Sequence, residues 1–241
     1  MTPDIIILGQ GRWGKRLRLD YSKRGKAVQT WSHQMEPFDI PKVELVIVAI
    51  PSPYIAKTIN PFTIDPDTPV CTAVKGLDEF GRLPSKAIRD TWKSKNVSVM
   101  GGACISSEDK LQLLIESDVK ALEWVGILKN IYAIGFNIER ATNGDNMAAV
   151  WFTKAWEELS GFVVETRYMA DFVTTCMSEN SRNAKTGKMI AKGKKRIAIY
   201  FNLGGEVPEG IHTADMIKKY GYYSNLELLH ETVDKIVGTG N

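Results

Sequence analysis

The chain has 241 residues, of which 44% are hydrophobic and 24% are charged, so it is long enough for one or two globular domains with a sizeable core. Its formal net charge of +3 is too small and too evenly spread to favour nucleic acid as a partner. The three cysteines lie far apart without CxxC spacing, so we expect neither a disulfide framework nor a metal site.

The start of the chain runs directly into an apolar strand, residues 4–8, without a charged leader. No apolar run in the sequence approaches the length of a membrane helix. We therefore expect no signal peptide, no membrane span and a cytoplasmic protein. The densest basic run, residues 192–196, is interpreted as a solvated loop or an anion contact.

A glycine-rich turn, GQGRWG at residues 9–14, follows the first strand and precedes a basic, helix-compatible stretch. In a dinucleotide site, Gly9 permits the tight turn, Gly11 lets a pyrophosphate approach the backbone, and Gly14 lets helix and strand pack closely. The N–H groups at the start of the helix then favour the phosphates. The strand, turn and helix together predict a dinucleotide site; the alternative is a glycine-rich turn without a ligand.

Four further apolar strands are predicted, at residues 27–31, 43–50, 68–74 and 97–100, with helices at 54–60 and 83–93. The connection at residues 32–42 is too short for a crossover helix, so we expect an irregular loop there. Ligands lie outside the carboxyl ends of the strands in an open parallel sheet. Gly9, Pro51, Lys75 and Gly101 all fall at such ends.

Beyond residue 107 the hydrophobic pattern becomes helical. Ile127, Ile131, Ile134 and Ile138 form one stripe that must be buried, whereas Lys129 lies about 200° around the same helix. A lysine there either snorkels along a half-buried helix or has a function. Further helices are predicted near residues 147–159, 181–192, 211–220 and 225–237. The expected fold class is α/β: a Rossmann-type doubly wound, mainly parallel sheet in residues 1–117 and an all-α domain in residues 118–241.

Eight motifs occur in an order that carries a resemblance to a known family: GQGRWG, VIVAIPS, TAVKGLD, ILKNIYAIGFNI, GDNMAA, ADFVTTC, SRNAKTGKMIAKG and PEGIHTA. From end to end they resemble the NAD(P)-dependent glycerol-3-phosphate dehydrogenases. The resemblance implies hydride exchange between a nicotinamide cofactor and dihydroxyacetone phosphate or sn-glycerol 3-phosphate, a reaction that feeds glycerophospholipid synthesis. It also suggests a homodimer.

The catalytic residues implied by this resemblance match what the chemistry needs. Reducing a ketone requires a proton donor for the developing alkoxide, and Lys129 matches the family's catalytic lysine. Lys75 matches the lysine that contacts both substrate and cofactor, and two ammonium groups close together would depress each other's pKa. Asp171 matches the carboxylate that orients the lysine. Taken alone, Asp171 is more typical of an acid at a helix N-terminus.

The resemblance also implies the binding residues. Ser181, Arg182 and Asn183 would cradle a phosphate at a helix start; the alternative is an ordinary N-cap with a surface arginine. Glu209 matches a cofactor-contacting turn, or is a capping acid. The expected substrate contacts are Lys75, Gly101, Asn130, Thr175, Ser181, Arg182 and Asn183. The expected cofactor contacts are Gly9, Gly11, Arg12, Trp13, Gly14, His33, Pro51, Lys75, Arg182 and Glu209.

The end of the second strand bears on the choice between NAD and NADP. An NAD-specific site places an acid there for the ribose 2′-hydroxyl, but this chain has Ser32 and His33. Both side chains can donate to a 2′-phosphate, and Arg12 adds positive charge. NADP is therefore favoured over NAD; the alternative is that the short loop contacts neither ribose group.

The chain departs from the family's pattern in two ways. It is shorter after Trp31, after Gly102, and between Leu159 and Asp171, and Ala103 stands where the family has a hydroxyl. Two other functions therefore remain open: a reductase of another small phospho-ketone or β-hydroxy acid of similar architecture, or a non-catalytic nucleotide-binding sensor. The presence of both Lys129 and Asp171 argues against the sensor, because a binding protein has no use for a proton donor.

Overall fold

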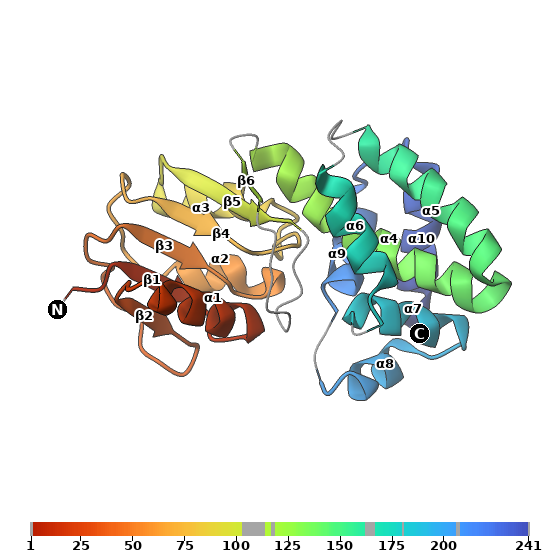
Figure 1. Ribbon diagram of the computed structural model, residues 1–241, viewed down its shortest axis with the longest axis horizontal. Coiled ribbons are helices and arrows are strands. Elements are labelled where there is room, and N and C mark those ends of the chain that lie inside the picture. The colour runs from red at the N-terminus through yellow and green to blue at the C-terminus, as the bar shows by residue number, and fades with distance from the viewer. Residues whose placement is uncertain are drawn as a thin grey trace. The chain divides into compact units, whose positions relative to one another are not determined.

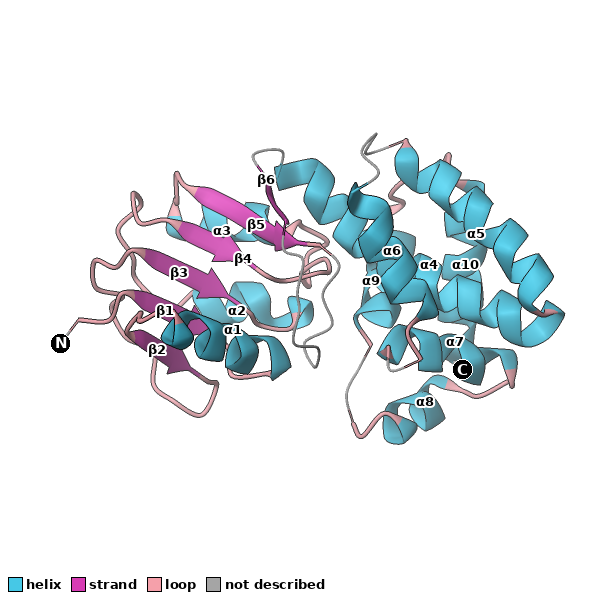
Figure 2. Cartoon of the chain, viewed as in Figure 1, coloured by secondary structure: helices cyan, strands magenta, loops and turns pink. Residues whose placement is uncertain are grey.

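The computed structural model describes residues 2–102, 114–116, 119–161, 167–179, 181–205 and 208–240. The chain divides into two compact units, Met1–Glu123 and Trp124–Asn241. The first unit contains the sheet and its covering helices, and the second is helical (Figures 1 and 2). The predicted fold class is confirmed. The division into functional domains after residue 117 stays a prediction. Within the described residues, no helix is long and apolar enough to cross a membrane.

The described residues of the first unit form a six-stranded sheet with the order β2-β1-β3-β4-β5-β6. The first five strands run parallel, and β6 (Leu114–Glu116) pairs antiparallel with β5. The five predicted strands are all present, as β1 (Ile5–Leu8), β2 (Val28–Trp31), β3 (Leu45–Val48), β4 (Val70–Thr72) and β5 (Val97–Gly101). The expectation that strands end before residue 107 is wrong, because β6 adds an edge strand.

The central strands β1 and β3 are buried on both faces of the sheet, which is why they are continuous apolar runs. Ile5 and Ile7 pack on one face with Leu17 of α1 (Arg12–Lys23). Ile6 and Leu8 face the other side. After the short turn η1 (Ser52–Tyr54), two helices contribute to that second core: α2 (Ile55–Ile59) and α3 (Pro84–Trp92). Helices on both faces make the sheet doubly wound.

The connection from β2 to β3 contains no helix, as expected from its length. Trp31 organises it: the indole Nε1 donates to the carbonyl oxygens of Met35 and Glu36 at 3.0 and 3.2 Å. The Trp31 ring also meets Phe62 edge to face, with centroids 5.1 Å apart. These contacts replace the crossover helix that a longer connection would place over this edge of the sheet.

The second unit is formed around α4 (Val119–Asn143), whose Ile127, Ile131 and Ile134 are fully buried. The first residues of α4 belong to the first unit. Around its later turns lie α5 (Asp145–Ser160), α6 (Arg167–Met177), α7 (Arg182–Ala191), α8 (Arg196–Asn202), α9 (Glu209–Tyr220), α10 (Glu227–Val237) and η2 (Gly238–Gly240).

One half-buried carboxylate ties three of these helices together. Glu158 of α5 accepts hydrogen bonds from the Tyr132 hydroxyl at 2.7 Å and from the N–H groups of Leu228 and Leu229 at 2.7 and 3.0 Å. It therefore caps the N-terminus of α10, where unpaired N–H groups need an acceptor. This interaction fixes α5 and α10 against α4.

Candidate functional site

The glycine turn after β1 has the geometry of a dinucleotide cradle. Gly9 has φ of 122°, and a Cβ there would lie 2.3 Å from the Ala49 carbonyl oxygen. A Cβ on Gly14 would lie 1.9 Å from the Gly9 oxygen, so α1 packs closer to the turn than a side chain allows. A Cβ on Gly11, by contrast, would meet nothing within 4 Å. The cradle is closed at Gly9 and Gly14 and open at Gly11, where a ligand's phosphates would approach.

Helix α1 begins directly after this opening. Gly11 is its N-cap without a side-chain acceptor, and its first turn contains no acid. Arg12 is exposed and Trp13 is half-buried. The Lys75 Nζ atom, from the turn after β4, lies 5.8 Å from the centroid of the Trp13 ring. Trp13, from the predicted dinucleotide turn, and Lys75, predicted at the end of another strand, therefore meet at the cradle, with an arrangement suited to an anionic ligand.

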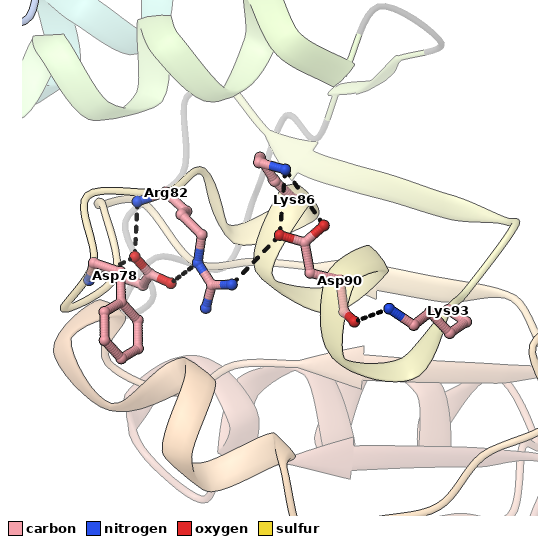
Figure 3. Close-up of polar contacts among 6 residues, drawn as sticks. Asp78, Arg82, Lys86, Asp90 and Lys93 are labelled. Carbon is pink, nitrogen blue, oxygen red and sulfur yellow. Dashed lines mark hydrogen bonds and ion pairs between the residues drawn. The ribbon is translucent and has the colours of Figure 1, made fainter.

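The segment that follows Lys75, residues 78–82, is held to α3 by an ion-pair network that was not predicted from the sequence (Figure 3). Asp78 is fully buried and accepts from the N–H groups of Phe80 and Arg82 at 2.9 and 2.7 Å. The Arg82 Nε atom donates to the second Asp78 oxygen at 2.8 Å, and Arg82 also reaches Asp90 of α3 at 3.4 Å. Asp78 lies in the motif TAVKGLD, but its partners are not evident from a local pattern.

The other predicted residues of the first unit lie at or after the carboxyl ends of parallel strands. His33 is exposed, two residues after β2, and Pro51 precedes η1 after β3. Gly101 ends β5, and a Cβ there would lie 2.5 Å from Leu122 Cδ1. The Gln10 side chain joins the glycine turn to β2 by donating to Thr30 Oγ1 at 3.0 Å.

In the second unit, Lys129 of α4 and Asp171 of α6 form a buried ion pair. Lys129 is 2% exposed and Asp171 is 4% exposed, and the Lys129 ammonium donates to Asp171 Oδ1. Snorkelling is therefore excluded for Lys129, and Asp171 lies in the second turn of α6 rather than at its N-terminus. Burying two charges costs about as much as their attraction returns. A buried pair in a helical core is therefore a candidate functional group.

The Cys176 thiol is buried on the same helix as Asp171, one turn further along. Burial raises the pKa of this thiol, and the nearby charge of Lys129 only partly opposes the shift. The thiol therefore stays protonated and is not a candidate nucleophile.

A second polar cluster lies one residue along α4. Asn130 accepts a hydrogen bond from Asn183 Nδ2 of α7 at 2.9 Å and donates to the Gly126 carbonyl at 3.2 Å. Asn183 is 9% exposed, yet its Oδ1 has no partner among the described residues. Gly210 of α9 lies against both, because a Cβ there would be 2.9 Å from the Asn130 carbonyl oxygen and 3.0 Å from Asn183 Oδ1. A buried acceptor without a partner indicates a missing donor.

The remaining predicted residues of the second unit lie at the starts of helices or form hydrogen bonds within their own helix. Ser181 is the N-cap of α7 and accepts from the Ala184 N–H at 3.4 Å, and half-buried Arg182 is the first residue of that helix. Thr175 donates to the Asp171 carbonyl at 2.7 Å. Glu209 is the first residue of α9 and is half-buried. Ser181 is therefore an N-cap, as the alternative to a phosphate cradle predicted. A role of Ser181 in ligand binding stays a prediction.

The comparisons with known proteins agree with one another. A family model described as the NAD-dependent glycerol-3-phosphate dehydrogenase C-terminus matches residues 118–240. A glycerol-3-phosphate dehydrogenase from Synechocystis sp., named as using NAD(P)+, is 25% identical over 90% of this chain and 83% of its own.

Two solved structures show the same fold. Glycerol-3-phosphate dehydrogenase from Coxiella burnetii aligns with a TM-score of 0.82 and 19% identity, covering 98% of this chain and 94% of that one. The Plasmodium falciparum protein aligns with a TM-score of 0.76 and 17% identity, covering 98% and 92%. Because the family model covers more than half of the chain, the chain belongs to the NAD-dependent glycerol-3-phosphate dehydrogenase family.

Proposed function

We propose that this protein is an oxidoreductase that interconverts dihydroxyacetone phosphate and sn-glycerol 3-phosphate with NAD(P)H. The observation that carries the proposal is the buried Lys129–Asp171 pair, which lies in the part of the chain that the family model matches. When bound, the nicotinamide supplies the hydride. Addition of a hydride to a ketone leaves an alkoxide, and an ammonium group within reach supplies its proton.

Each member of the pair has a separate role in this proposal. Lys129 donates the proton to the alkoxide oxygen. Asp171 holds the ammonium in place, because its carboxylate accepts from Nζ inside a buried helical core. In the reverse direction the same lysine, once neutral, takes the proton from the alcohol. Lys75 is proposed, on family membership alone, to add positive charge that stabilises the developing oxyanion.

Substrate binding is assigned to the start of α7 and the neighbouring asparagines. Arg182 would bind the phosphate through charge-assisted hydrogen bonds, helped by the N–H groups at the start of the helix. The unpartnered Asn183 Oδ1 supports a contact with a donor such as a substrate hydroxyl. Gly101, Asn130, Thr175 and Ser181 complete the proposed substrate set.

The cofactor is assigned to the glycine turn. Gly9, Gly11 and Gly14 shape the cradle, and Arg12, Trp13, Lys75 and Pro51 border it. Arg182 and Glu209 are proposed contacts from the second unit, on family membership alone. The chain's relatives are named as using NAD(P)+, which leaves the preference between NAD and NADP to the residues after β2.

We favour NADP, because the exposed His33 follows β2 directly and no acid stands between Trp31 and His33. The test is kcat/KM for NADPH and NADH in the wild type and in His33→Asp. We expect the wild type to prefer NADPH and the variant to shift towards NADH, because a carboxylate repels a 2′-phosphate and binds a 2′-hydroxyl. A wild-type preference for NADH, or no shift in the variant, would show that His33 does not contact the 2′ group.

The proposed substrate is tested by a matched pair of ketones. We expect oxidation of NADPH or NADH with dihydroxyacetone phosphate and a far lower kcat/KM with dihydroxyacetone, which lacks only the phosphate. Better use of the phosphate-free ketone would instead indicate a reductase of another substrate class. Cofactor binding in calorimetry without turnover would indicate a nucleotide sensor. We also propose a homodimer and a supply of glycerophospholipid precursor, both from family membership.

A further inference from the structure

Helix α8 presents an apolar face to solvent. Ile197, Tyr200 and Phe201 are 63%, 37% and 70% exposed. Their spacing of three and four residues places them on one side of a helix. Figure 1 shows α8 at the edge of the helical unit, between its connections to α7 and α9. Three large apolar side chains on one exposed face are more than the isolated surface hydrophobics of a typical monomer.

The opposite side of α8 anchors the helix, so this exposure is fixed by packing. Ile199 is fully buried. Arg196 donates from Nη1 and Nη2 to the two oxygens of Asp215 on α9, at 2.8 and 2.9 Å. The Gly205 N–H donates to the Tyr200 carbonyl at 3.1 Å and closes the end of the helix. A rotation that hid Phe201 would expose Ile199 and break the bidentate ion pair.

The sequence around α8 carries charge of one sign. Between Glu179 and Glu206 there is no acidic residue, and Lys192, Lys194 and Lys195 directly precede the helix. All three lysines are exposed. The run interpreted from sequence as a solvated loop or an anion contact therefore adjoins the apolar face, and together they form a basic–apolar patch: Lys192, Lys194, Lys195, Ile197, Tyr200 and Phe201.

We propose that the basic–apolar patch docks reversibly on the surface of an anionic phospholipid bilayer. Apolar side chains that enter the boundary between headgroups and acyl chains, next to lysines that meet anionic headgroups, are the features of peripheral membrane contacts. Tyrosine is favoured at that depth because its ring is apolar and its hydroxyl stays hydrated. A three-residue apolar face is small, so the contact requires the lysines and weakens with salt.

The charge of the basic–apolar patch also argues against a second copy of this chain as its binding partner. A two-fold interface brings the same patch of both subunits together. It would place the lysine run of one copy against that of the other, and like charges across an interface oppose association. A lipid surface with anionic headgroups meets the lysines with the opposite charge and the apolar face with hydrocarbon.

The test is flotation of the full-length protein with vesicles of phosphatidylcholine alone or mixed with phosphatidylglycerol. We expect binding to the mixed vesicles, roughly tenfold weaker binding to phosphatidylcholine alone, and loss of binding at high salt. Ile197→Ser with Phe201→Ser should reduce the binding about tenfold or more, because the inserting side chains are removed. Replacing the three lysines by glutamine should reduce it to a similar extent.

A matched control is available on α5, where Met147 and Val150 are 49% and 50% exposed. Met147→Ser with Val150→Ser removes two exposed apolar side chains that lie outside the basic–apolar patch and should leave vesicle binding unchanged. Circular dichroism and Tm should match the wild type, since all the changed side chains are exposed. If the variant with Ile197→Ser and Phe201→Ser does not fold, the variant with the three lysines replaced by glutamine still tests the proposal.

Three results would overturn the proposal. The first is equal binding to neutral and anionic vesicles, or none to either. The second is binding that survives both the serine and the glutamine changes. The third is self-association in sedimentation experiments that the Ile197 and Phe201 changes abolish while vesicles are not bound, which would make the patch an interface between copies.

Discussion

Lys129 and Asp171 give the clearest expectation for a single residue. Asp171→Asn leaves a buried ammonium without its carboxylate, and breaking such a pair costs about 3–5 kcal/mol of stability. We expect urea unfolding to show a loss of this order and kcat to fall, because the ammonium is no longer held in place. An Asp171→Asn protein with wild-type stability would show that the ion pair is not formed in solution.

Arg182 is expected to act on binding rather than on the chemical step. Arg182→Ala removes a charge-assisted contact to the phosphate, so KM for dihydroxyacetone phosphate should rise by a large factor while kcat changes less. Lys185→Ala is the matched control, since Lys185 is an exposed cation on the same helix and should leave KM unchanged. Steady-state kinetics with both variants separates the two. An Arg182 variant impaired mainly in kcat would contradict the assignment.

Some residue roles were accessible from sequence and others were not. The pairing of Lys129 with Asp171 was predicted through the motif order, although the residues are 42 positions apart. The Glu158 cap of α10, which joins residues 70 positions apart, was not predicted, because no local pattern encodes a long-range partner. Asp78 was missed for a different reason: an acid in a turn is most simply solvated, and only its burial shows the network.

At the level of elements, the glycine turn permits a test with a built-in control. Gly14→Ala would place a methyl group 1.9 Å from the Gly9 oxygen, so α1 must shift, at a cost of about 1–3 kcal/mol. Gly11→Ala meets no protein atom within 4 Å and should leave Tm unchanged but weaken cofactor binding, since its methyl group enters the proposed pyrophosphate space. Thermal unfolding and calorimetric titration measure the two effects. The reverse ranking would contradict the cradle.

The start of α3 predicts a pH dependence of stability. Glu123 accepts from the Ser85 N–H at 2.7 Å and from its hydroxyl, and is 3% exposed. Burial raises the pKa of Glu123 to about 7 from 4.5, with the Ser85 hydrogen bonds opposing the shift. The folded state therefore binds the proton more tightly than the unfolded state, and this carboxyl makes the protein less stable as the pH rises from 4.5 through 7.

The full effect is about 3 kcal/mol, at about 1.4 kcal/mol per pKa unit. Urea unfolding of the wild type and Glu123→Gln across this range isolates it, because other groups titrate in both proteins. The stability of the wild type relative to the variant should fall as the pH rises. A constant difference between the two proteins would show that the Glu123 carboxyl does not titrate there.

The elements that sequence predicted best are those whose pattern matches their burial. Strands β1 and β3 are apolar on both faces because helices cover both, and α4 carries its isoleucines on a buried stripe. Strand β6 has three residues, too few for a pattern. Helix α8 was not predicted because its largest apolar residues face solvent, the reverse of the arrangement on which amphipathic patterns depend.

For the whole molecule, shorter connections are compatible with an intact sheet. The alignment with the Synechocystis relative covers 83% of that protein. One of the connections that are shorter than in the family was predicted directly after Trp31. There the Trp31 and Phe62 rings and the indole hydrogen bonds close the edge of the core without a crossover helix. The five parallel strands stay paired in register from β2 to β5.

The central claim, a ketone reductase whose proton donor is Lys129, is tested most directly by steady-state kinetics with dihydroxyacetone phosphate and saturating NADPH or NADH. The account predicts turnover by the wild type and a kcat lower by about two to four decades in Lys129→Ala, with cofactor affinity unchanged in calorimetry. A folded wild-type protein that binds cofactor but oxidises neither nucleotide, or a Lys129→Ala protein with wild-type kcat, would contradict it.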